Sequence, residues 1–213
     1  MPIGTIYHSG HVLLLARAAH DRSAVSKSEA EVCISLCASA LEGFLNETAH
    51  SFSLAESSES AVALAEVLTE AENSHLSPVI KFRLAAFIVS GRFPRRGDMV
   101  IQRLTALIKL RNSLMHLKPE PMFTLDEAHP LYDNLQKPPS EVALLISEGV
   151  IKVSKNYSGS WRQLVATPDV ARWAYMATVD AMQWLTSVAV DTLVRERLEF
   201  QTQGLHEIIN NVS

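Results

Sequence analysis

The chain has 213 residues, of which 47% are hydrophobic and 20% are charged. A chain of this length and composition can bury a core without disulfides or metals, which excludes an intrinsically disordered protein. Its formal net charge of −4 argues against sequence-independent coating of nucleic acid, although a small basic site on an acidic surface remains compatible with it. We find no signal peptide and no membrane-spanning stretch, and we therefore expect a cytoplasmic protein.

Helical periodicity dominates the first half of the chain. Ser28 with Glu31 has the spacing of a capping box, and Ser77 followed by Pro78 is typical of a helix start. Gly91 and the prolines after residue 118 are helix-stop signals. These signals predict five helices, over residues 8–21, 28–50, 58–73, 78–90 and 98–117.

The pattern breaks over residues 119–167, where five prolines occur. We expect a long connection there, with one short helix and some extended chain. A last long helix should follow, with Thr167 as its cap and Pro168 in its first turn, and residues 204–213 are expected to form a loose tail. The whole chain, residues 1–213, is thus predicted to be a single all-α domain, a bundle of about five or six helices with an irregular insertion.

The fifth predicted helix has an arginine in its apolar stripe. The spacing of 4, 3, 4 and 3 residues places five side chains on one helix face: Val100, Leu104, Leu107, Arg111 and Leu114. A guanidinium buried there needs a carboxylate, a site that admits a phosphate, or a subunit interface. Asn112 and His116 are four residues apart and share the neighbouring face.

The second predicted helix supplies candidate partners for this arginine. Its polar face carries Ser35, Ser39, Glu42 and Asn46, opposite an apolar face that includes Cys33 and Cys37. We expect Glu42 to neutralise Arg111 and Asn46 to support the pair. The alternative is that the polar face is only a solvent-facing stripe.

We expect no metal and no cofactor. His8 and His11 have a spacing that can hold a metal ion, but no carboxylate or thiolate companion is evident beside them in the sequence. Cys33 and Cys37 are interpreted as small buried apolar side chains.

Two segments resemble the HEPN superfamily. These are "ALEGFLNE" in an early long helix and "KLRNSLMH", which closes a later helix before a proline. The motif of that superfamily is an arginine, four to six residues, and then a histidine, with a polar residue usually after the arginine. Arg111, Asn112 and His116 match this motif. The resemblance covers residues 28–118 and the last long helix, whereas residues 119–167 have no counterpart.

The resemblance implies metal-independent RNA cleavage by a symmetric homodimer whose two motifs face one cleft. His116 would move protons, Arg111 would bind the phosphate oxygens, and Asn112 would orient the ribose or the histidine. The products would be a 2′,3′-cyclic phosphate and a 5′-hydroxyl. It also implies a toxin or antiphage defence effector, with a neutralising or regulatory protein as partner.

Some features depart from this pattern. Related toxins often carry a tyrosine two residues after the histidine, where this chain has Lys118. Candidate RNA contacts are Arg92, Arg95 and Arg96 in a basic turn, together with Lys118, and Lys81 and Arg83 could extend this surface; an idle solvated turn is the alternative. A catalytically silent module that binds a nucleotide, RNA or a protein is the competing functional hypothesis. A purely structural bridge between Arg111 and Glu42 would also explain the apolar stripe.

Overall fold

The structure is a computed structural model that describes residues 8–53, 58–116, 123–124, 138–154 and 157–210. The all-α class predicted from the sequence is confirmed in this part of the chain. The helices are α1 (Ser9–Arg22), α2 (Lys27–Ser53), α3 (Glu59–Asn73), α4 (Pro78–Ser90), α5 (Met99–Met115), α6 (Ser140–Ser147), α7 (Trp161–Val165), α8 (Pro168–Val188) and α9 (Thr192–Asn210). The strands β1 (Phe123–Thr124) and β2 (Ser158–Gly159) form one short antiparallel pair.

The helices outnumber the five or six that we predicted. Two of them, α6 and α7, lie inside the expected irregular insertion, and the predicted last helix is two helices, α8 and α9. The chain leaves helical geometry at Ala189, and the Asp191 carboxylate then accepts a hydrogen bond from the Val194 N–H at 3.1 Å. An aspartate that bonds the backbone three residues on begins a new helix, so the break is encoded locally.

Most predicted boundaries agree with the structure within three residues. Ser77 precedes α4, and the Thr167 hydroxyl caps α8 by accepting from the Val170 N–H at 3.4 Å. Three details differ from the prediction. Helix α2 starts at Lys27, so Ser28 lies inside it; α5 ends at Met115; and α9 continues to Asn210, where we expected a loose tail from residue 204.

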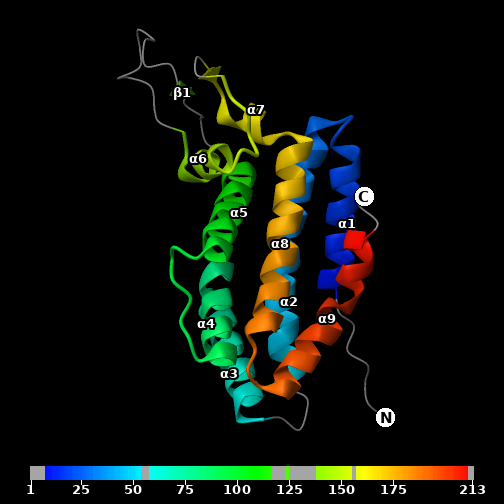
Figure 1. The fold of residues 1–213 in the computed structure, drawn as a ribbon, viewed down its shortest axis with the longest axis vertical. Helices are drawn as coiled ribbons and strands as arrows, with labels where there is room; N and C mark the ends of the chain where they lie inside the picture. Colours follow the sequence, from blue (N-terminus) through cyan, green and yellow to red (C-terminus); the bar gives the residue numbers. More distant parts are fainter. Residues whose placement is uncertain (1–7, 54–57, 117–122, 125–137, 155–156, 211–213) are drawn as a thin grey trace.

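The long helix α2 lies inside the bundle and packs against α1, α3, α5 and α8 (Figure 1). Its buried face includes Cys33, Cys37 and Phe44, and the two thiols are free with their sulfurs 3.9 Å apart. The interpretation of both cysteines as buried is confirmed. None of the described helices combines the length and apolarity that a membrane crossing requires.

The start of α1 depends on a side chain from α2. The Glu47 carboxylate accepts the backbone N–H of His8 and, at 2.9 Å, that of Ser9, and it also bonds the Ser9 hydroxyl. A carboxylate at this position satisfies free N–H groups and complements the positive end of the helix dipole. Helix α1 is therefore capped from its neighbour, while its own N-cap residue, His8, offers no side-chain hydrogen bond.

Helices α6 and α7 lie together at one end of the bundle, beside the end of α5 and the start of α8 (Figure 1). A polar cluster holds α6 there: Nε of Arg103 is 3.2 Å from both carboxylate oxygens of Glu148, and the indole N–H of Trp173 donates to Glu148 at 2.9 Å. The insertion is thus anchored to both α5 and α8 by a residue at the end of α6.

Candidate functional site

The last two turns of α5 carry the residues that the sequence singled out. Leu104 and Leu107 are fully buried, whereas 28% of the Arg111 side chain is exposed. Arg111 is therefore only partly buried, although the Nε atom of its guanidinium is shielded from solvent. It is less buried than the leucines that precede it in the stripe, because the aliphatic stem of an arginine can pack on apolar surface while the end of the side chain stays accessible.

Arg111 faces Glu42 of α2, as we predicted. Its Nη2 lies 3.6 Å from Oε2 of Glu42, whose side chain is 37% exposed. This separation exceeds the ~2.7–2.9 Å of a strong charge-assisted hydrogen bond. The buried Nε of Arg111 has no hydrogen-bond partner among the described residues. The guanidinium is thus neutralised loosely, and its donors are not saturated by the protein groups described.

Asn112 and His116 are both exposed beside this pair. His116 has left helical geometry, with φ −101° and ψ 85°, while its backbone N–H still donates to the Asn112 carbonyl at 2.9 Å. Met115, between them, is 63% exposed. The end of α5 therefore presents a guanidinium, an amide, an imidazole and a thioether on accessible surface.

Asn46 does not support Arg111 in the way we predicted. Its side-chain oxygen accepts from Nζ of Lys81 at 3.5 Å, and Lys81 also forms an ion pair with Glu72. Lys81 is only 2% exposed, so it does not belong to a basic surface. The polar face of α2 thus serves two separate cations, with Glu42 next to one and Asn46 next to the other.

The basic turn before α5 contains Arg92, Arg95 and Arg96, all exposed. Arg111 lies 12 residues after Met99, the first residue of α5, which is about 18 Å along the helix axis. The basic turn therefore lies well away from Arg111 of the same chain. Lys118 lies outside the described residues.

The guanidinium of Arg83 is also held by contacts within the protein. Its Nε and Nη2 donate to the Pro94 carbonyl at 3.3 and 3.0 Å, and its guanidinium lies 4.4 Å from the centre of the Phe93 ring. These contacts order the basic turn against α4. Arg83 thus contributes to a basic surface mainly by shaping the turn.

Sequence reasoning missed a second charged cluster on α5. Arg103 lies between Glu148 and Asp180, at 3.2 and 3.5 Å. Burial raises the pKa of Asp180, an effect that the charge of Arg103 opposes. Glu148 is distant in sequence and falls in the insertion, so no local spacing could have revealed the cluster. Within the described ranges, no three His, Cys, Asp or Glu side chains are grouped to hold a metal ion.

No protein-family model, no curated protein and no solved structure matches this chain. A functional conclusion must therefore depend on the chemistry around Arg111 and on the motif resemblance. Those residues combine an anion-binding group with a side chain that can transfer protons near neutral pH.

Proposed function

We propose that this protein is a metal-independent endoribonuclease that acts as a symmetric homodimer, with Arg111 and His116 as its catalytic residues. The observation that supports the proposal is the arrangement at the end of α5. A loosely paired guanidinium lies there, and an exposed amide and an exposed imidazole follow it within five residues.

The chemistry needs two kinds of group. Attack by the ribose 2′-hydroxyl requires removal of its proton and donation of a proton to the leaving 5′-oxygen, and imidazole can do either. Negative charge develops on the phosphate oxygens, and a guanidinium stabilises it through two parallel hydrogen bonds. His116 has the first role and Arg111 the second, while Asn112 orients the ribose or the imidazole.

A dimer follows from the number of groups each motif supplies. One motif offers a single imidazole, whereas the reaction uses both an acid and a base. Two motifs across a two-fold axis would supply both groups, and the exposed Met115 offers apolar surface to the contact. We therefore expect light scattering to show a dimer at micromolar concentration, and a monomer alone would contradict this part of the proposal.

RNA must displace Glu42 from Arg111, or share the guanidinium with it. The long Arg111–Glu42 separation of 3.6 Å supports this exchange, because a loosely held partner costs little to release. Removing the carboxylate with Glu42→Gln should thus leave Arg111 free for phosphate. The biological role in this proposal is that of a toxin or antiphage effector, restrained by a neutralising protein partner.

The same ion pair favours a second candidate function. If Glu42 permanently satisfies Arg111, the pair is a structural link between α2 and α5, and the protein is a catalytically silent module that binds a nucleotide, RNA or a protein. The two candidates differ in one measurable property, which is cleavage of RNA.

The test is cleavage of labelled single-stranded RNA with EDTA in excess. We expect the parent to cut RNA but not DNA, because DNA lacks the 2′-hydroxyl. His116→Ala and Arg111→Ala should each lose about 10²–10⁴-fold in rate, and Asn112→Ala should lose less.

Matched controls separate the site from general effects. His50→Ala removes another exposed histidine at the end of a helix, and Arg172→Ala removes an exposed arginine of α8. Both should retain the parental rate. Undiminished cleavage by His116→Ala would assign the activity to another site or to a contaminant, and a parent that cleaves no RNA would favour the silent module.

A further inference from the structure

A cavity of about 560 Å³ lies between α4, α5 and α6, away from the Arg111–Glu42 pair. Its volume falls within the ~300–1,000 Å³ of small-molecule sites. Val79 and Ile80 of α4, Ile101 and Ile108 of α5 and Leu144 of α6 give it a mainly aliphatic lining. None of the described residues that line it is aromatic, so these residues offer a flat nucleobase no partner for stacking.

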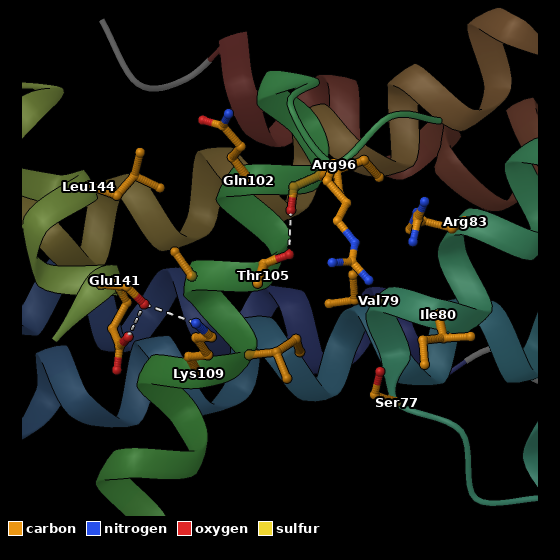
Figure 2. Close-up of a pocket in the computed structure, with 14 residues that line it drawn as sticks. Ser77, Val79, Ile80, Arg83, Arg96, Gln102, Thr105, Lys109, Glu141 and Leu144 are labelled. Atoms are coloured by element: carbon orange, nitrogen blue, oxygen red, sulfur yellow. Dashed lines mark hydrogen bonds between the residues drawn. The ribbon is translucent and has the colours of Figure 1, made fainter. Parts of the chain in front are cut away.

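Basic side chains mark one end of this cavity. Figure 2 shows Arg96 and Arg83 at one end and Lys109 and Glu141 at the other. Arg83 is held by the Pro94 carbonyl, whereas Arg96 is exposed and forms no hydrogen bond or ion pair with another described side chain. An anionic group would therefore meet Arg96 first.

The opposite end is already neutralised. Nζ of Lys109 donates to the Ser140 hydroxyl at 2.9 Å, and that hydroxyl donates to the Glu141 carboxylate at 3.1 Å. Glu141 is only 7% exposed and also lies 3.5 Å from the Ser113 hydroxyl. This end is therefore closed by protein groups bonded to one another, and the uncompensated positive charge lies at the Arg96 end.

We propose that this cavity binds a small amphipathic acid, whose anionic head pairs with Arg96 and whose aliphatic body lies on Val79, Ile101 and Ile108. The charge asymmetry sets the orientation, and the aliphatic lining selects the body. The site is independent of the proposed RNase centre, because Arg111 points from α5 toward α2 while Ile101, Thr105 and Ile108 face the cavity.

The test uses the fluorescent probe 1-anilinonaphthalene-8-sulfonate with the full-length protein, followed by displacement. We expect saturable binding of the probe and displacement by decanoate and by decyl phosphate, whose relative strength distinguishes a carboxylate from a phosphate head. AMP should not displace it. Effective displacement by AMP together with none by decanoate would overturn the proposed ligand class.

Substitutions locate the probe. Arg96→Ala should weaken binding about tenfold, which corresponds to ~1.4 kcal/mol, and Arg96→Glu should weaken it more. Arg95→Ala is the matched control, because Arg95 is exposed in the same turn but does not line the cavity. Thr105→Trp should block binding by filling the cavity, and far-UV circular dichroism reports whether this variant folds.

Parental binding by both folded Arg96 variants would overturn the proposal, as would the absence of saturable binding to the parent. If Arg96→Glu instead converts a dimer into a monomer, with no effect of decanoate on either form, the cavity is an interface between two copies and the small-acid proposal fails. Because RNA cleavage does not enter any of these measurements, they stand apart from the test of the catalytic function.

Discussion

The ion pair between Glu42 and Arg111 allows a quantitative test of how tightly α2 holds α5. Glu42→Gln keeps the shape of the side chain and removes its charge, and Arg111→Met keeps much of the aliphatic stem and removes the guanidinium. Together with the double variant they form a thermodynamic cycle that isolates the coupling between the two side chains.

The expected coupling follows from the geometry. At 3.6 Å, two unit charges attract by about 1 kcal/mol in water and by about 5 kcal/mol at an effective dielectric constant near 20. The side chains are 28% and 37% exposed, so solvent screening and side-chain entropy bring the net value near that of exposed pairs, ~0.2–1 kcal/mol. We expect a coupling of about 1 kcal/mol. A single variant that loses this much stability should melt about 2–4 °C below the parent, for a chain of this size.

Urea unfolding followed by far-UV circular dichroism measures the four free energies, and repeating it at high salt should reduce the coupling. A coupling indistinguishable from zero would refute the electrostatic link and show that Glu42 does not stabilise Arg111. A coupling of several kcal/mol would refute the loose pairing that the RNase proposal requires, because RNA could not readily displace such a partner.

Three further predictions concern stability. Asp191→Ala should destabilise the protein by about 0.5–2 kcal/mol at neutral pH. Hydrogen bonds to the Asp191 carboxylate, of which the one from Ser58 has the largest effect, lower its pKa. Urea titrations should therefore show the stability difference between parent and variant disappear as the pH falls through that lowered pKa. Glu72→Gln should cost about 1–3 kcal/mol in the same assay, since it deprives the buried Lys81 ammonium of its ion pair; a cost no larger than that of an exposed glutamate elsewhere on α3 would contradict this. Burial raises the pKa of Tyr175 from 10 to about 12, so alkaline unfolding experiments should show stability falling between these pH values in the parent and not in Tyr175→Phe. That variant should be neutral or slightly stabilising near pH 7, because the buried hydroxyl has no hydrogen-bond partner in the described part of the chain.

The first half of the fold could be predicted because its signals are local. Apolar spacing together with Ser77, Pro78 and Gly91 defines α4, and the same kind of pattern gives α1, α3 and α5. The division between α8 and α9 also had a local signal, Asp191 followed by a new helix. We missed it because the apolar period continues across the break.

The candidate site was predictable to the extent that a charged side chain in an apolar stripe requires a group of opposite charge. Arg111 in an apolar stripe called for a carboxylate, a phosphate site or a subunit interface, and Glu42 was the suitable carboxylate on α2. The same reasoning assigned Asn46 to Arg111, but its side-chain oxygen accepts from a second cation, Lys81. Which of two cations an amide contacts depends on how α4 packs between α3 and α5, and no spacing within α2 contains that information.

The capping of α1 by Glu47 has a consequence for the order of folding. A helix of 14 residues is marginal when isolated, and this one takes its N-terminal carboxylate from a residue 38 positions later. Helix α1 should therefore become ordered only after α2 has formed, as one cooperative unit with it. Amide hydrogen exchange should show the first turn of α1 opening with the last turns of α2, which carry Glu47, and Glu47→Gln should accelerate exchange in that turn without equal change in α8.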